Sequence, residues 1–200
     1  MNGRLRLMIV TLLLAGGPCL YSKQSKSEGR PRLTLIQCDM AGIPPRIRLR
    51  AKSETTRIFD RAGVDVIWIE AEAGCKIPSM DRCFIVVVVP LPPEAWNKPY
   101  ATGFAPVRNG AYRRAYIFYD RVTSVAKTFS LTHVPDTVGV ILGHAVAHEL
   151  GHLLLPDDAH SPNGIMRDEW NFRLSEEAAA GRLLFSENQT KVIREELRAN

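Results

Sequence analysis

The chain has 200 residues, of which 46% are hydrophobic and 24% are charged, so it has the composition of a globular protein and the length of one domain. Its formal net charge is +5, but lysine and arginine are scattered among the acidic residues. This pattern does not favour a nucleic-acid-binding protein, which would need a basic face. The sequence has no internal repeat.

The first 22 residues are typical of a secretory signal peptide. Arg4 and Arg6 precede an apolar run, residues 7–15, which is followed by small residues and Cys19. The run is shorter than the roughly 20 apolar residues that span a bilayer, and a retained anchor is the alternative. We expect export to the periplasm, the cell surface or the medium, with no membrane span after cleavage. Lipid attachment at Cys19 is a further alternative, although a proline precedes it.

Residues 23–32 have the polar composition of a linker, and we expect one catalytic domain over residues 33–200. The pattern of apolar and turn residues predicts strands at 33–36, 64–69, 84–89, 101–105 and 115–119, and helices at 46–62, 121–129, 137–155 and 187–198. The β-branched run at 84–89 indicates a strand buried on both faces. Asn109-Gly110 predicts a hairpin-like connection between the last two strands. These elements make an α+β fold, a mixed sheet packed with helices.

Export would expose the cysteines to an oxidising compartment, where disulfides form. Cys75 and Cys83 bracket a short, turn-rich segment between two apolar strands. We therefore predict a disulfide between them. Two reduced thiols at strand ends are the alternative, because cysteine pairing cannot be deduced from sequence alone.

The helix expected at 137–155 carries the segment His148-Glu149-Leu150-Gly151-His152. Residues four apart share one face of an α-helix, so His148 and His152 can present two imidazoles to one metal ion. Glu149 lies beside them, where its carboxylate can take a proton from an attacking water. Zinc is the expected metal, because it prefers imidazole in tetrahedral sites and leaves a position open when catalytic. A chance match without metal is the alternative.

Zinc needs a third protein ligand, and His160 follows His152 by eight positions, beyond the expected end of the helix. With the later Gly164-Ile165-Met166, this segment resembles the metzincin superfamily, whose third histidine is followed by a tight turn with a methionine beneath the zinc. The resemblance implies a metzincin-like (zincin) domain. It also implies that His148, His152 and His160 bind zinc and that Met166 lies under the metal.

Residues 144–167 carry the closest part of the resemblance, but they depart from the metzincin pattern. Leu155 stands where metzincins have a glycine, and the connection to the third histidine is two residues longer. Asp157 or Asp158 therefore stays open as the third ligand, since some zinc peptidases use aspartate there.

The resemblance implies a zinc-dependent endopeptidase that acts on polypeptides, with Glu149 as general base and then proton donor. A non-catalytic zinc-binding protein that uses the fold for partner recognition is the alternative. Glu149 favours the enzyme, because metal binding alone does not require its carboxylate. We also expect an extended substrate to pair with the strand around 103–105, as in zinc peptidases of the resembled fold.

Overall fold

The computed structural model describes residues 29–71, 75, 83–96, 101–106, 113–129, 134–156, 159–168 and 171–199. The expected signal peptide at 1–22 lies outside these residues, as does most of the expected linker. Within the described ranges, no helix has both the length and the apolar character needed to cross a membrane.

One mixed sheet contains the five strands of the described residues. In chain order these are β1 (Arg32–Asp39), β2 (Asp65–Glu70), β3 (Cys83–Val89), β4 (Gly103–Phe104) and β5 (Arg113–Phe118). Their order across the sheet is β2-β1-β3-β5-β4, with β4 antiparallel to β5 and the other pairs parallel. The five predicted strands and the hairpin-like pairing of the last two are therefore confirmed. The first six residues of β3 are buried, as its β-branched run predicts.

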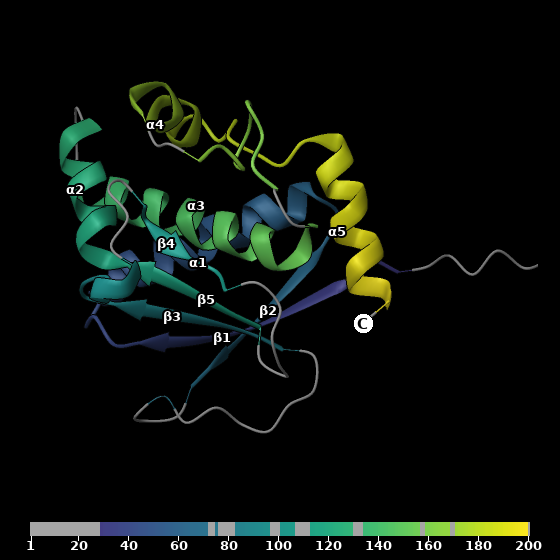
Figure 1. Cartoon of the computed structure of the whole chain (residues 1–200), viewed down its shortest axis with the longest axis horizontal. Helices are drawn as coiled ribbons and strands as arrows, with labels where there is room; N and C mark the ends of the chain where they lie inside the picture. Colours follow the sequence, from purple (N-terminus) through teal and green to yellow (C-terminus); the bar gives the residue numbers. More distant parts are fainter. Residues whose placement is uncertain are drawn as a thin grey trace, which may run out of the picture.

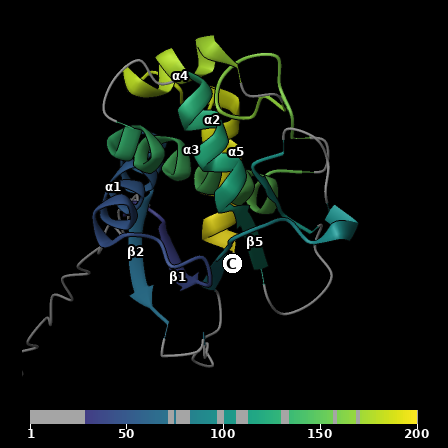
Figure 2. The ribbon, with the colours of Figure 1, turned by 90° about the vertical axis from the view of Figure 1, so that its left-hand side faces the viewer.

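The helices lie mainly on one side of this sheet. They are α1 (Pro45–Arg61), α2 (Tyr119–Phe129), α3 (Val134–Leu154), α4 (Phe172–Ala179) and α5 (Glu187–Ala199), and a short 3₁₀ turn, η1, spans Glu94–Trp96. Figure 1 shows α3 between the sheet and α4, and Figure 2 shows α1 beside α3. The sequence predicted four of these helices but not α4.

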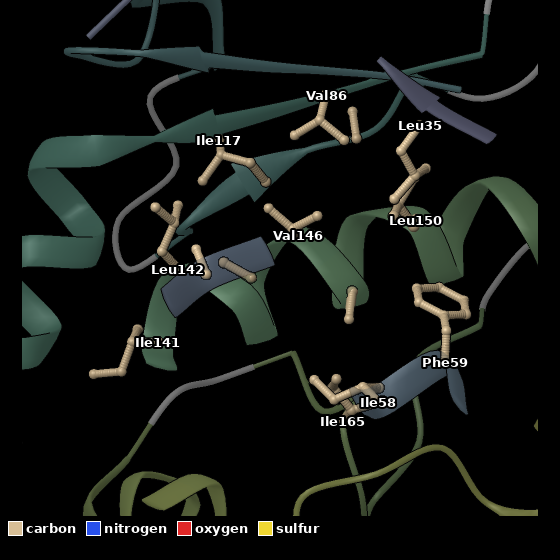
Figure 3. Close-up of a cluster of buried hydrophobic side chains, with 14 of the residues drawn as sticks. Leu35, Ile58, Phe59, Val86, Ile117, Ile141, Leu142, Val146, Leu150 and Ile165 are labelled. Atoms are coloured by element: carbon tan, nitrogen blue, oxygen red, sulfur yellow. The ribbon is translucent and has the colours of Figure 1, made fainter. Parts of the chain in front are cut away.

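The central helix α3 is apolar on nearly every side, and residues 138–147 are all buried. A helix of this kind belongs in the interior of a fold. In Figure 3 its side chains lie between the sheet residues Leu35, Val86 and Ile117 and the α1 residue Phe59, and all belong to one hydrophobic cluster. Because each fully buried aliphatic or aromatic side chain stabilises the fold by about 2 kcal/mol, α3 is held firmly against the sheet.

A disulfide joins Cys38 of β1 to Cys75, with their Cα atoms 5.2 Å apart. The predicted Cys75–Cys83 bridge is therefore wrong, and Cys83 is a buried cysteine outside the disulfide. Cys75 packs with Cys38 and Val87. Cys83 begins β3 opposite Thr34, four residues before Cys38 along β1. Four strand residues span about 13 Å, so a Cys75 that contacts Cys38 is too far from Cys83.

Candidate metal centre

Three histidines come together near the C-terminal end of α3. His148, His152 and His160 each offer a ring nitrogen, and these atoms lie within 4.8 Å of one another. The Nε2 atoms of the two helical histidines are 3.1 Å apart. The ring of His160 comes from the segment after the helix, with its centroid 4.7 Å from that of His152. The alternative ligands Asp157 and Asp158 lie outside the described residues.

The ring of His148 is oriented by a backbone group. Its Nδ1 atom lies 2.8 Å from the carbonyl oxygen of Ile165. A carbonyl oxygen can only accept, so Nδ1 carries the hydrogen and Nε2 keeps its lone pair. Metal-binding histidines usually have their second nitrogen fixed in this way. His148 therefore presents a free lone pair toward His152.

Burial keeps both helical histidines neutral. Desolvation lowers the pKa of His148 to about 4 and that of His152 to about 3, and repulsion from neighbouring imidazoles adds to the effect. At neutral pH both rings are uncharged, which is the form that binds metal.

The donor set fits zinc. Three imidazoles are a ligand set that zinc uses in catalytic sites. Two nitrogens bound to zinc at its usual distance in a tetrahedral site are about 3.3 Å apart. The 3.1 Å between the Nε2 atoms of His148 and His152 is close to this separation.

Glu149 points from α3 toward the edge strand β4. Its side chain is buried, and desolvation raises the pKa of its carboxyl group to about 8. A Cβ atom on Gly103 would lie 2.8 Å from Oε1 of Glu149 and 2.6 Å from the carbonyl oxygen of Tyr116. The strand therefore passes against the carboxylate at a position where no side chain fits.

Met166 lies against the helical turn that carries both helical histidines. It is fully buried. A Cβ atom on Gly151 would overlap the sulfur of Met166 and would lie 3.1 Å from Cε1 of Phe185. The predicted methionine is thus packed on the segment between His148 and His152, where a glycine makes room for it.

The turn that leads to Met166 is closed by backbone hydrogen bonds. The N–H of Ser161 donates to the carbonyl oxygen of Met166 at 2.9 Å, and the N–H of Ile165 donates to that of Leu184 at 3.0 Å. Gly164 has a φ of 77°, and a Cβ atom there would lie 2.7 Å from the oxygen of Leu184. Both the conformation and the close approach require glycine.

Sequence analysis missed two supporting groups, the carbonyl oxygens of Ile165 and Leu184. They are backbone atoms, so no residue type marks them in the sequence. His144, one turn before His148 on α3, is fully buried, with Nδ1 2.9 Å from the carbonyl oxygen of Val140 and Nε2 3.7 Å from Glu54. Its ring belongs to the interior between α1 and α3.

The sequence matches no protein-family model and no curated protein. Among solved structures, the chain is similar to an archaemetzincin from Methanopyrus kandleri, with a TM-score of 0.51 and 17% identity over 84% of this chain and 96% of that chain. At this identity the likeness concerns the fold. The domain is an α+β domain with a metzincin-like (zincin) fold, as the sequence resemblance implied.

Proposed function

We propose that this chain is a zinc-dependent endopeptidase in which His148, His152 and His160 hold the metal and Glu149 is the general base. The observation that carries the proposal is the position of Glu149, which directly follows His148 on α3 and whose buried side chain lies against Gly103 of the edge strand β4. Purely structural zinc sites are closed by four protein ligands. Three histidines beside a carboxylate that is not needed as a ligand are instead the arrangement of a hydrolytic site.

Zinc held by the three imidazoles would supply a Lewis acid for the scissile carbonyl and would lower the pKa of water. Glu149 takes the proton from the attacking water and then donates it to the leaving amine. In the metal-free protein, burial raises the pKa of this carboxyl group to about 8, and the positive charge of a bound zinc ion would lower this pKa and favour the carboxylate form that accepts the proton. Met166 supports the helical turn from below and takes no part in proton transfer.

The edge strand supplies a place for an extended substrate. Among the described strands, β4 pairs only with β5, so its other edge can add a further strand. Because Gly103 lies against Glu149, a polypeptide backbone paired with this edge would pass beside the general base. This geometry supports cleavage within an extended polypeptide.

Export remains part of the proposal. The Cys38–Cys75 disulfide supports it, since disulfides persist in oxidising compartments and are rare in the cytosol. Removal of the expected signal peptide at 1–22 would leave the described domain intact.

Metal analysis and a proteolysis assay on the same purified protein test the function. We expect about one zinc per chain and hydrolysis of an unstructured protein such as casein, lost on chelation and restored by zinc. One zinc per chain without hydrolysis of a diverse peptide library would overturn the enzyme and favour the non-catalytic zinc-binding protein. Failure to bind zinc would overturn both.

A further inference from the structure

His160 differs from the other two candidate ligands in its exposure. His148 and His152 are partly buried on a packed helix, whereas His160 is exposed on the segment after it. Packing therefore constrains the two helical rings more than the ring of His160. The position of an exposed ligand depends on how firmly its backbone is held.

The next residue, Ser161, is held at three points. Its N–H donates to the carbonyl oxygen of Met166, and its hydroxyl donates to that of Asn163 at 2.8 Å. Its Oγ also accepts a hydrogen bond from Nε2 of Gln189, at 3.3 Å. The first two bonds close the turn on itself, and only the third ties it to another element, α5.

Gln189 is well placed for this contact because its other groups are fixed. Its Oε1 accepts from the N–H of Ser186 at 2.9 Å, and its own N–H donates to Oγ of Ser186 at 3.3 Å. These reciprocal bonds form a capping box at the start of α5. Since the Ser186 N–H is a donor, the amide oxygen faces it and the amide nitrogen faces Ser161.

We propose that Gln189 is a positioning residue for the metal centre, which holds His160 in place through Ser161. The inference rests on the proposed role of His160 as a zinc ligand. The carbonyl oxygen of Leu184, just before α5, also accepts a hydrogen bond from the N–H of Ile165. The segment 184–189 therefore holds residues 161–166 at two separate points.

The amide is essential to this role. A capping box accepts glutamine or glutamate at this position, and a carboxylate is the better partner for a helix N-terminus. The Ser161 hydroxyl already donates to Asn163, so its oxygen needs a donor, which glutamate lacks. With glutamate at position 189, a carboxylate oxygen would face the Ser161 oxygen with no hydrogen between them, or the Ser161 hydroxyl would donate to the carboxylate and lose its hydrogen bond to Asn163.

Two full-chain variants separate positioning from folding. In Gln189→Glu the cap remains and the bond to Ser161 is lost, whereas in Ser186→Ala the cap is weakened and the amide still reaches Ser161. We expect Gln189→Glu to weaken zinc binding about 10-fold, the lower end of the effect of removing a group that orients a metal ligand. Competition with a chromophoric chelator measures this affinity. The visible spectrum of the cobalt-substituted protein should shift as well, while the metal-free protein should not unfold at a lower temperature than the wild type, because the cap is kept.

Ser186→Ala should give the opposite result, a lower unfolding temperature with wild-type zinc affinity and cobalt spectrum. Ser161→Ala should weaken zinc binding, because it removes the hydrogen bonds to Gln189 and Asn163. Adding Gln189→Glu to it should weaken binding no further, because the contact that Gln189→Glu breaks is already lost. Wild-type zinc affinity and cobalt spectrum in Gln189→Glu would overturn the positioning role and leave the peptidase proposal standing. Metal binding without peptidase activity in the wild-type protein would overturn the peptidase alone.

Discussion

The Nδ1 atom of His148 donates a hydrogen bond to the carbonyl oxygen of Ile165 at 2.8 Å, so the turn that follows the third histidine orients the ring of the first. The N–H of the same Ile165 donates to Leu184. One residue thus links the candidate metal centre to the segment between α4 and α5. Changes in the turn at residues 161–166 should therefore affect metal binding.

Gly164→Ala is the first such change. Its φ of 77° costs a side-chain-bearing residue about 1 to 2 kcal/mol, and the added Cβ must also push away the oxygen of Leu184. We expect chemical denaturation of the metal-free protein to show a loss of about 3 kcal/mol, with weaker zinc binding because Ile165 moves. Gly42→Ala is the matched control, since Gly42 has a φ of 67° but a Cβ atom there would meet nothing within 4 Å. Equal losses in the two variants would contradict the close packing on Leu184.

Gly103→Ala should separate catalysis from metal binding. The new Cβ would occupy space beside Oε1 of Glu149 and displace the carboxylate or β4. Displacement of a catalytic group by about 1 Å can cost roughly 100-fold in rate, so we expect a loss of this order in kcat with one zinc still bound. Gly29→Ala, where a Cβ would meet no atom within 4 Å, should leave kcat unchanged. A normal kcat in Gly103→Ala would count against the placement of Glu149 under β4.

The Cys38–Cys75 disulfide closes a loop with a sequence separation of 37 residues. A loop of this length stabilises the folded state by about 4 kcal/mol in the chain-entropy model. We expect the free energy of unfolding of the Cys38→Ala/Cys75→Ala variant, measured by chemical denaturation, to be lower by about 4 kcal/mol. Peptide mapping without reduction should recover Cys38 linked to Cys75, and recovery of a Cys75–Cys83 peptide would contradict the structure.

The long, strongly patterned elements could be predicted from sequence. The apolar helix around residues 137–155 and the β-branched run at 84–89 bury nearly all their residues, so their patterns are hard to mistake. The helix α4 could not be recognised in the same way, because its eight residues are fewer than the roughly 11 to 18 over which helical periodicity can be read. Its end signals were present: Asn171 caps it through the N–H of Leu174, and Gly181 follows it with a φ of 69°.

At the site, the spacing of His148, His152 and His160 identified side chains that the structure brings together. The backbone groups that hold these side chains in place could not be predicted from the sequence. Ile165 and Leu184 act through backbone oxygens, which every residue type has. The disulfide prediction failed for a related reason. The spacing of Cys75 and Cys83 shows that they are near in sequence, whereas pairing depends on which residue of the folded sheet lies beside Cys75, and that residue is Cys38 of β1.

The identity of the third ligand can be tested by metal retention. His160→Ala should lose most of its zinc, because a site with two imidazoles binds far more weakly than a site with three. Asp157→Ala and Asp158→Ala should retain about one zinc per chain. Loss of zinc in either aspartate variant, with normal retention in His160→Ala, would overturn the metzincin-like ligand set.

The hydrolysis rate of zinc-loaded Glu149→Gln beside wild-type protein, at equal zinc content, tests the proposed mechanism most directly. Glutamine keeps the size of the side chain, so it fits beneath Gly103, but it cannot take a proton from water. The mechanism predicts one zinc per chain in both proteins and a loss of about 10²- to 10⁴-fold in kcat, the usual contribution of a general base. Wild-type kcat in zinc-loaded Glu149→Gln would contradict it.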